Sequence, residues 1–505
     1  MKNPENNKRI TRNMIILYFR MFFIMGISLY TSRVILEVLG VVDFGIYSVV
    51  GGVVIMLSFF NTAMTSATQR FISFELGKND SVQLERVFSM SVNTHITIAL
   101  LIFILAETVG LWFLNAKLEL PVERLEAANW IYQISIFSFM TTVIGVPYLA
   151  LIIAHERMNI YAYVTAAESI LKLIIALVLS WIAYDKLKMY AFLSFSSCLV
   201  MLITYMLYCK RNFPKTKFKF FWDKSLYVSL MEYTGWNIFG NLSLVTMGQG
   251  INILLNLFVG PIANAAWAIS FQLNNAVALF SYNIRLAVNP QIVKSHARGD
   301  DEYMKSLVFQ SAKYSFFLLL LVVLPIILET DSILRIWLNE IPDFTVLFCQ
   351  LMLINALLQC FDASFGMVFQ AIGKIKENQL LSGGMYLLVL PVSYFLLVLE
   401  FQPHVVFYVQ IVATMLTAFV IKLYLLRKLA GLSYSEYSRK LAFPVLKVSL
   451  VALIVPVLSR IYMDEGALRF LTIVAVTLIS IPISVYYLDL TNEMKIKVKS
   501  YIFSY

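Results

Sequence analysis

Charged residues are scarce in this 505-residue chain, and that scarcity excludes whole classes of protein. Only 14% of the residues are Asp, Glu, Lys or Arg, whereas soluble globular proteins carry about a quarter. With 60% hydrophobic residues and a mean hydropathy of +0.77, the chain cannot build a water-soluble core and shell. The motif G-x-x-x-x-G-K-[ST] is absent, and no loop is long enough for a nucleotide domain, which disfavours an ATP-driven pump.

Cysteine is also rare, and the four cysteines have the spacing of neither a metal site nor a disulfide framework. They lie in or beside apolar runs, where a thiol acts as a small hydrophobic residue. We therefore expect no metal and no cofactor. The core residues expected from this pattern are Cys198, Cys209, Cys349 and Cys360.

What the chain has instead is a series of apolar runs of about 18 to 25 residues, each able to cross about 30 Å of hydrocarbon as a helix. They are too long for barrel strands and lack alternation. The first run has no small-residue cleavage site, so it predicts a spanning helix and not a signal peptide. The fold class is therefore an all-α integral membrane protein with about 14 transmembrane helices, expected over residues 14–36, 45–64, 92–114, 130–152, 162–183, 190–209, 236–259, 265–288, 312–328, 345–369, 380–399, 404–425, 445–461 and 468–488.

The basic residues gather in alternate loops. About 29 of the 40 Lys and Arg fall in the loops on the side of both termini, about 8 on the other side and about 3 within helices. This asymmetry predicts that both termini are cytoplasmic. The net charge of +10 is spread over these short loops, so we expect membrane lipids and no nucleic acid as partners.

An internal repeat relates the two halves of the chain. Gly40 and Tyr47 match Gly260 and Trp267, each pair around the turn into an even-numbered helix. A second set, Gln69, Ser73 and Gly77, matches Gln291, Ser295 and Gly299. Six helices separate the partners, so the halves have the same orientation. The expected domains are a six-helix lobe over 1–215, a second six-helix lobe over 216–430, and helices 13 and 14 with a cytoplasmic tail over 431–505.

Polar stripes mark the first two helices of each half, where helical spacing places them on one face. Polar groups are costly in hydrocarbon, so such stripes favour a hydrophilic cavity between two lobes, although Asn and Ser can also join helices by hydrogen bonds. Arginines can snorkel or pair structurally. Arg33, near the outer interface, fits anchoring as well as ligand contact. The candidate substrate-binding residues are Arg20, Arg33, Asn237, Asn241, Asn252, Asn274, Arg285 and Asn289.

Two acidic residues inside the apolar runs, Asp362 and Glu168, can be explained by pairing with a cation. Asp362 on the tenth helix is either the counter-ion of an arginine or an ion-coupling carboxylate, with H+ or Na+ as the ion, and the counter-ion is favoured. Glu168 and Lys172 are four residues apart on the fifth helix, which predicts that they pair with each other.

Several short sequence stretches near the start of the chain are distinctive. The stretches Thr31–Arg33, Leu39–Tyr47, Ser66–Phe71 and Glu75–Lys78 resemble the polysaccharide-biosynthesis transporters of the multidrug/oligosaccharidyl-lipid/polysaccharide exporter superfamily, and more narrowly the O-antigen or capsule repeat-unit flippases of bacteria. The rest of the chain matches in helix number, repeat and loop length.

The resemblance implies a monomeric transporter, and not an enzyme, in the bacterial cytoplasmic (inner) membrane. Its substrate would be a lipid-linked oligosaccharide for lipopolysaccharide or capsule, whose undecaprenyl pyrophosphate anchor is flipped to the periplasmic leaflet by alternating access. In the related peptidoglycan-precursor flippases, arginines lie on the first and eighth helices, as Arg20 and Arg285 do here. The drug and cation exporters of the superfamily use acidic residues on the first, seventh and tenth helices, and only Asp362 has that counterpart.

Other functions remain open on sequence alone. A cation-coupled multidrug exporter is the main alternative, and ion-dependent efflux of small cations would identify it. A repeat-unit polymerase or ligase would need a large external loop, which the short outer loops do not supply. A channel is disfavoured by the two-lobe repeat, which is typical of alternating access.

The charge asymmetry makes a testable prediction about topology. In a variant without native cysteines, a cysteine at Lys215 or Lys440 should resist an impermeant thiol reagent in whole cells, because both loops carry the basic excess. A cysteine at Asn115 should be labelled. Labelling of all three positions would contradict the predicted orientation.

Overall fold

The computed structural model describes residues 4–55, 58–117, 122–338, 341–490, 492 and 495. Every regular element in these ranges is a helix, which confirms the all-α class. The α-helices are α1 (Pro4–Ile55), α2 (Ser58–Lys78), α3 (Ser81–Leu105), α4 (Leu111–Lys117), α5 (Leu125–Ala154), α6 (Met158–Leu179), α7 (Lys186–Asn212), α8 (Lys224–Val259), α9 (Pro261–Ala297), α10 (Asp301–Leu328), α11 (Thr330–Trp337), α12 (Thr345–Ile372), α13 (Lys376–Val398), α14 (Val405–Leu416), α15 (Lys422–Ala430), α16 (Tyr434–Tyr437), α17 (Phe443–Tyr462) and α18 (Ala467–Leu488). The π-helical turns η1 (Ala106–Gly110), η3 (Thr417–Ile421) and η4 (Ser438–Ala442) continue neighbouring helices, and a 3₁₀ turn, η2 (Val122–Arg124), precedes α5.

Twelve helical spans in the described ranges are long and apolar enough to cross a membrane. For example, the 28 residues of α10 span about 42 Å at about 1.5 Å per residue. Two of the expected helices are not among the twelve. That over 265–288 lies in α9, and that over 45–64 lies on the end of α1 and the start of α2, on either side of residues 56–57. Both expected helices carry the polar residues that marked them in the sequence, and those residues lower their hydropathy.

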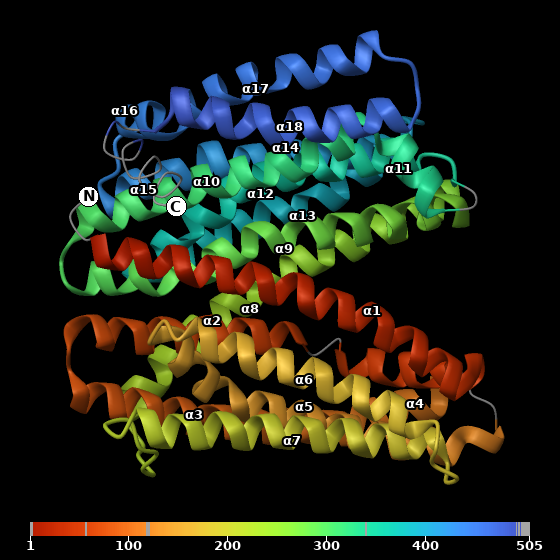
Figure 1. Cartoon of the computed structure of the whole chain (residues 1–505). Coiled ribbons are helices and arrows are strands. Elements are labelled where there is room, and N and C mark those ends of the chain that lie inside the picture. Colours follow the sequence, from red (N-terminus) through yellow and green to blue (C-terminus); the bar gives the residue numbers. More distant parts are fainter. Residues whose placement is uncertain are drawn as a thin grey trace, which may run out of the picture. The chain divides into compact units, whose positions relative to one another are not determined.

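The helices form two compact units. Unit 1 is Met1–Asn241 together with Asn289–Asp300, and unit 2 is Leu242–Val288 together with Asp301–Tyr505. In unit 1, α5 packs against α7, α2, α3 and α1, while α6 packs along α1 (Figure 1). In unit 2, α12 packs against α10 and α14. The long helices α8 and α9 each pass from one unit into the other.

The last two helices are built into unit 2. They pair with each other and lie along α10, as Figure 1 shows in blue. Leu320 and Leu324 of α10 pack there with Ala452 and Ile481. Ion pairs add to this contact: Arg469 donates to both carboxylate oxygens of Glu329 at 2.6 and 3.0 Å, and Lys313 lies 2.6 Å from Asp489. Burial raises the pKa of Glu329, but the hydrogen bonds from Arg469 and Ser332 outweigh that effect and leave the pKa lowered.

The turn between the paired helices of each repeat depends on glycine. Gly40 adopts φ 75° and ψ 168°, and Gly260 adopts φ 97°, both in a region that L side chains rarely enter. The neighbours also correspond, because Tyr47 and Trp267 both pack into or against buried apolar clusters. The backbone at these two positions agrees with the expected repeat, with Gly260 in the place of Gly40.

The second set of repeat partners was wrong by two positions. Helix α2 ends with Asn79 at φ 58° and α9 ends with Gly299 at φ 76°. Asp80 N–H donates to the Glu75 carbonyl and Asp300 N–H to the Ser295 carbonyl, so the two helices end with the same geometry and Gly299 corresponds to Asn79. The pairing of Gly77 with Gly299 was based on residue type alone, and the sequence does not contain the backbone angles that show the correct correspondence.

Substituting the two kinds of glycine should separate their roles. We expect Gly40→Ala to lower the free energy of unfolding by about 1 to 3 kcal/mol, because alanine cannot adopt its backbone angles without strain. Gly26→Ala, inside the helical part of α1 and with no atom within 4 Å of where its Cβ would lie, is the matched control and should be neutral or stabilising. The melting temperature of the purified protein in detergent measures both. An unchanged value for Gly40→Ala would contradict the strained turn.

Candidate functional site

The predicted binding residues are divided between the two units. Each residue has its own set of contacts within its unit. Unit 1 contains Arg20, Arg33, Asn237, Asn241 and Asn289, and unit 2 contains Asn252, Asn274, Arg285 and Asp362.

Arg20 is held in a defined orientation by α6. Its Nε donates to Thr165 Oγ1 at 2.6 Å and its Nη2 to the Tyr161 hydroxyl at 3.1 Å. The guanidinium carbon also lies 4.3 Å from the centroid of the Tyr161 ring, a cation–π distance. The side chain is half-buried, and these two α6 residues orient it without neutralising its charge.

The same face of α6 carries the pair Glu168 and Lys172. Lys172 Nζ lies 2.6 Å from a Glu168 carboxylate oxygen, which confirms the predicted i,i+4 contact. Tyr161, Thr165, Glu168 and Lys172 follow one another at steps of three or four, so a polar stripe runs along the middle of α6. Arg20 meets the beginning of this stripe.

The other unit 1 residues have different surroundings. Arg33 is exposed on α1 and makes no side-chain hydrogen bond or ion pair to a described residue. Asn237 is buried beside Tyr233, and Asn241 and Asn289 are half-buried. Tyr233 also lies 5.9 Å from the Arg70 guanidinium, which brings Asn237 close to a cation that the sequence did not single out.

In unit 2, Arg285 is oriented by its own helix, since its Nη1 donates to Ser281 Oγ at 2.7 Å. Asn274 is half-buried on the same helix. Asn252 has a structural contact: Asn264 Nδ2 donates to its side-chain oxygen at 2.6 Å and to its carbonyl at 2.9 Å. That bond joins α8 to α9 across the Gly260 turn.

Asp362 is the counter-ion of a lysine, not of an arginine. Lys422 Nζ lies 2.7 Å from Asp362 Oδ1 and donates to the Asp362 carbonyl at 2.8 Å. Both side chains are largely buried, at 5% exposure for Lys422 and 15% for Asp362. The lysine directly follows the π-helical turn η3, and such turns often mark functional positions in helices.

A buried carboxylate that the sequence did not reveal lies between α5 and α6. The Glu156 side chain has no exposed surface and accepts hydrogen bonds from Gln291 Nε2 at 2.8 Å on both oxygens. Lys294 Nζ and Arg9 Nε lie 2.6 and 2.7 Å from it. Asn13 Nδ2 donates to the Glu156 carbonyl at 3.2 Å. One acid thus joins α1, the α5–α6 turn and the end of α9 within unit 1.

The neighbouring His155 is neutral. Burial, together with the charges of Lys294 and Arg157, lowers the pKa of His155 to about 4. Its ring stacks on Phe213 with centroids 4.1 Å apart. At neutral pH the His155 ring therefore adds no positive charge to the cations around Glu156.

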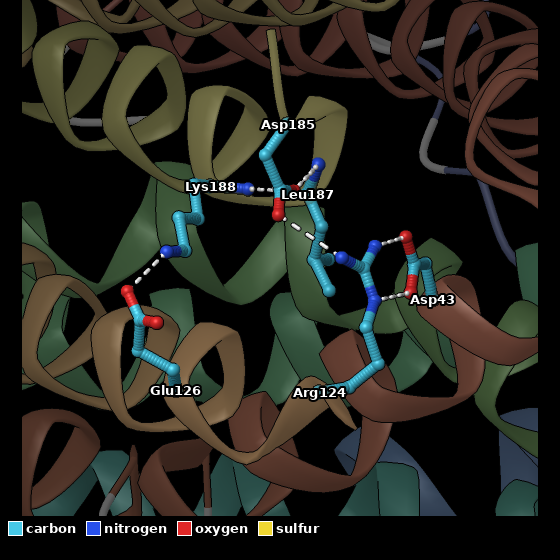
Figure 2. A network of polar contacts seen from close by, with 6 residues as sticks. All are labelled: Asp43, Arg124, Glu126, Asp185, Leu187 and Lys188. Carbon is cyan, nitrogen blue, oxygen red and sulfur yellow. Dashed lines mark hydrogen bonds and ion pairs between the residues drawn. The ribbon is translucent and has the colours of Figure 1, made fainter. Parts of the chain in front are cut away.

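The opposite end of α5 has a second ionic network, which Figure 2 shows. Arg124 contacts Asp43, just after the Gly40 turn, and lies 3.0 Å from Asp185, which accepts hydrogen bonds from the first backbone N–H groups of α7. The hydrogen bond to Asp43 raises the pKa of Arg124. Lys188 pairs with Glu126 beside it at 2.6 Å.

The sequence contained a signal for one of the missed residues. Lys422 is a lysine inside an apolar run, and such residues are rare and usually functional. Glu156 gave no signal, because a charged residue in a short loop is expected to be solvated.

Comparison with known proteins identifies the family and the fold. Residues 10–296 match the family model described as "Polysaccharide biosynthesis protein". No curated protein sequence matches the chain significantly.

Solved transporters share the fold at low sequence identity. A mutant MATE structure superposes with a TM-score of 0.72 at 13% identity, covering 82% of this chain and 95% of that one. An outward-facing multidrug resistance MATE family transporter of the MOP superfamily gives 0.70 at 14%, covering 84% and 98%. A MOP superfamily transporter from Pyrococcus furiosus, described as having a binding pocket of reverse polarity, gives 0.69 at 13%, covering 86% and 100%.

The Asp362–Lys422 pair can be tested by breaking it. Lys422→Met should lower the free energy of unfolding by about 3 to 5 kcal/mol, because it leaves a largely buried carboxylate without its cation. The double variant Asp362→Asn, Lys422→Met should recover most of that loss. Melting temperatures of the purified variants decide: equal destabilisation by the single and double variants would show that the pair is not the source.

Proposed function

The chain belongs to the polysaccharide biosynthesis protein family, and on that premise we propose that it is a flippase for a lipid-linked oligosaccharide. It moves the undecaprenyl pyrophosphate-linked sugar from the cytoplasmic to the periplasmic leaflet by alternating access through a cationic cavity. The product serves surface polysaccharide such as O-antigen. No bond of the substrate is made or broken, so the protein acts as a transporter and not as an enzyme.

The oriented guanidinium of Arg20 is the observation that carries this proposal. A pyrophosphate that leaves the headgroup region needs donors to replace its hydration, and arginine is a permanently charged, multidentate donor. Tyr161 and Thr165 use Nη2 and Nε of Arg20, so Nη1 is left to meet an anion. The orienting contacts reduce the entropy that ligand binding would otherwise cost.

The remaining predicted residues have roles that follow from their chemistry. Arg285, oriented by Ser281, is the second pyrophosphate ligand. Sugar hydroxyls need many partners of low specificity, which the asparagine amides supply. Because Asn252 already bonds Asn264, we place sugar contacts on Asn237, Asn241, Asn274 and Asn289, with Arg33 nearer the periplasmic surface.

The proposed setting is the bacterial inner membrane, with both termini cytoplasmic and the protein working as a monomer. The Glu156 end of α5 then faces the cytoplasm, and the Arg124 end faces the periplasm. Membrane lipids surround the apolar helices, and H+ or Na+ remains the candidate coupling ion.

A cation-coupled multidrug exporter of the same superfamily is the second candidate, since the MATE structures share the fold. Its coupling ion would need a free carboxylate. Asp362 already holds the ammonium of Lys422 at 2.7 Å, which occupies the place such an ion would take. This contact argues against Asp362 as the site of a coupling ion in either candidate.

The flippase proposal predicts a ranked effect at both arginines. Loss of one charge-assisted contact costs about 1.5 to 3 kcal/mol, or roughly ten- to a hundredfold in binding. Lysine keeps the charge but loses the planar fork. Surface-polysaccharide complementation of a flippase-deficient strain should therefore fall from wild type to Arg20→Lys to Arg20→Ala, and likewise at Arg285, at unchanged membrane abundance.

Arg12→Ala supplies the matched control, because Arg12 is an exposed arginine two turns before Arg20 on the same helix. It should complement like wild type. Full activity of the Arg20→Ala, Arg285→Ala double variant at normal abundance would refute the anion-binding role. Ion-dependent efflux of small cations, without complementation by the wild type, would favour the exporter instead.

A further inference from the structure

Glu156 joins three segments that are far apart in the sequence, and it does so with a single carboxylate. Gln291 and Lys294 from the end of α9, and Arg9 from the start of α1, converge on its two oxygens. Two cations share one acid, so without Glu156 the ammonium of Lys294 and the guanidinium of Arg9 would repel each other. The carboxylate is therefore the charged centre of the contact between the end of α9 and the rest of unit 1.

The helix held in this way changes units just before the contact. Residues of α9 up to Val288 belong to unit 2, and Asn289–Asp300 belongs to unit 1. Pro290 lies at this junction and lacks the N–H that would bond the carbonyl four residues earlier. Helices bend at such positions. The end of α9 can thus change direction relative to the part of the helix that carries Arg285.

The rest of the contact, between α2 and the end of α9, is made by small residues that could separate and come together again. A Cβ on Gly77 would lie 2.6 Å from Ala297 Cβ and 2.9 Å from Lys294 Cα, so α2 and α9 meet here almost backbone to backbone. Arg298 Nε donates to the Gly77 carbonyl at 3.3 Å. Small residues give close approach without interlocked side chains. Arg9 is 42% exposed, so water reaches the edge of the cluster and can replace its bonds.

We propose that Glu156 is a positioning residue that acts as a latch, which holds the end of α9 on unit 1 in one state of the transport cycle and releases it in the other. The inference rests on the proposed function, because it places the latch at the cytoplasmic end, where release admits the substrate. Substrate ligands such as Arg285 lie on the same helix, so the latch couples their position to the state of this end.

The latch is tested first without any substrate. Phe74 on α2 and His296 on α9 have ring centroids 6.5 Å apart, so cysteines at these positions report the contact. In a chain whose four native cysteines are alanine, a short bifunctional thiol cross-linker with a cleavable disulfide should join them efficiently. We expect Glu156→Gln to lower the cross-linking yield at least threefold, and Lys294→Gln to lower it as well.

Glu329→Gln is the matched control. Glu329 is also a buried carboxylate with a close arginine partner, but its partner Arg469 lies on α18 within unit 2. Loss of a buried ion pair as such destabilises both variants, whereas only the Glu156 variant should change the 74–296 yield. Yields are compared on monodisperse purified protein, and Lys294→Gln provides the second reading if Glu156→Gln does not accumulate. Equal yields in all variants, or equal losses in the Glu156 and Glu329 variants, would overturn the latch.

The second arm asks whether release is needed for transport. Cross-linking the 74–296 pair should abolish surface-polysaccharide complementation, and cleaving the linker should restore it. A purely structural contact would tolerate being locked, so continued transport by fully cross-linked protein would also overturn the proposal. If the uncross-linked protein supports no polysaccharide export at all, the proposed function fails, while the yields of the first arm still decide whether Glu156 holds α9.

Discussion

A charged side chain within the hydrocarbon must be ion-paired, stacked on an aromatic ring or hydrated, and this constraint determines which helices of the protein become neighbours. Even on the mildest scales, a charged residue at the centre of a spanning helix costs about 2.5 to 3.5 kcal/mol. Arg20 therefore lies against Tyr161 and Thr165, which places α1 on α6. Asp362 and Lys422 fix α12 against α15 in the same way. Apolar packing fills the space between these contacts, but apolar side chains alone are compatible with many arrangements.

The two ends of α5 show how the same kind of interaction can have different roles. The helix has 30 residues, so Arg124 before it and Glu156 after it are separated by about 45 Å. Arg124 ties the segment after the Gly40 turn to the start of α7, all within neighbouring parts of unit 1. Glu156 instead holds a segment whose helix continues into unit 2. The first contact joins elements of one unit, whereas the second holds a helix that continues past Pro290 to Arg285, a proposed substrate ligand.

Local features could be predicted from the sequence, and long-range pairing could not. The spans, the glycine turns at 40 and 260, and the Glu168–Lys172 pair depend on residues within a few positions of each other, where helix geometry determines the outcome. The cations that pair with Asp362 and Glu156 come from distant helices, and nothing in a single sequence specifies which cation reaches them. The second set of repeat partners was wrong because it relied on residue type alone. Positions 77 and 299 are both glycine, but the backbone angles show that Asn79 is the residue that corresponds to Gly299.

The fold itself does not select a substrate, because transporters of one fold differ in a few side chains inside the membrane. The balance of charge at those side chains is therefore the informative quantity. Glu168 is neutralised by Lys172, and Asp362 by Lys422, so neither acid offers a bare negative charge to a cation. The contacts that orient Arg20 are a hydroxyl, a phenol and an aromatic face, which leave its positive charge uncompensated. Within unit 1 the acid of α6 is thus satisfied by a lysine, whereas the guanidinium of Arg20 has no acidic partner among the described residues, and the proposed pyrophosphate substrate rests on this contrast.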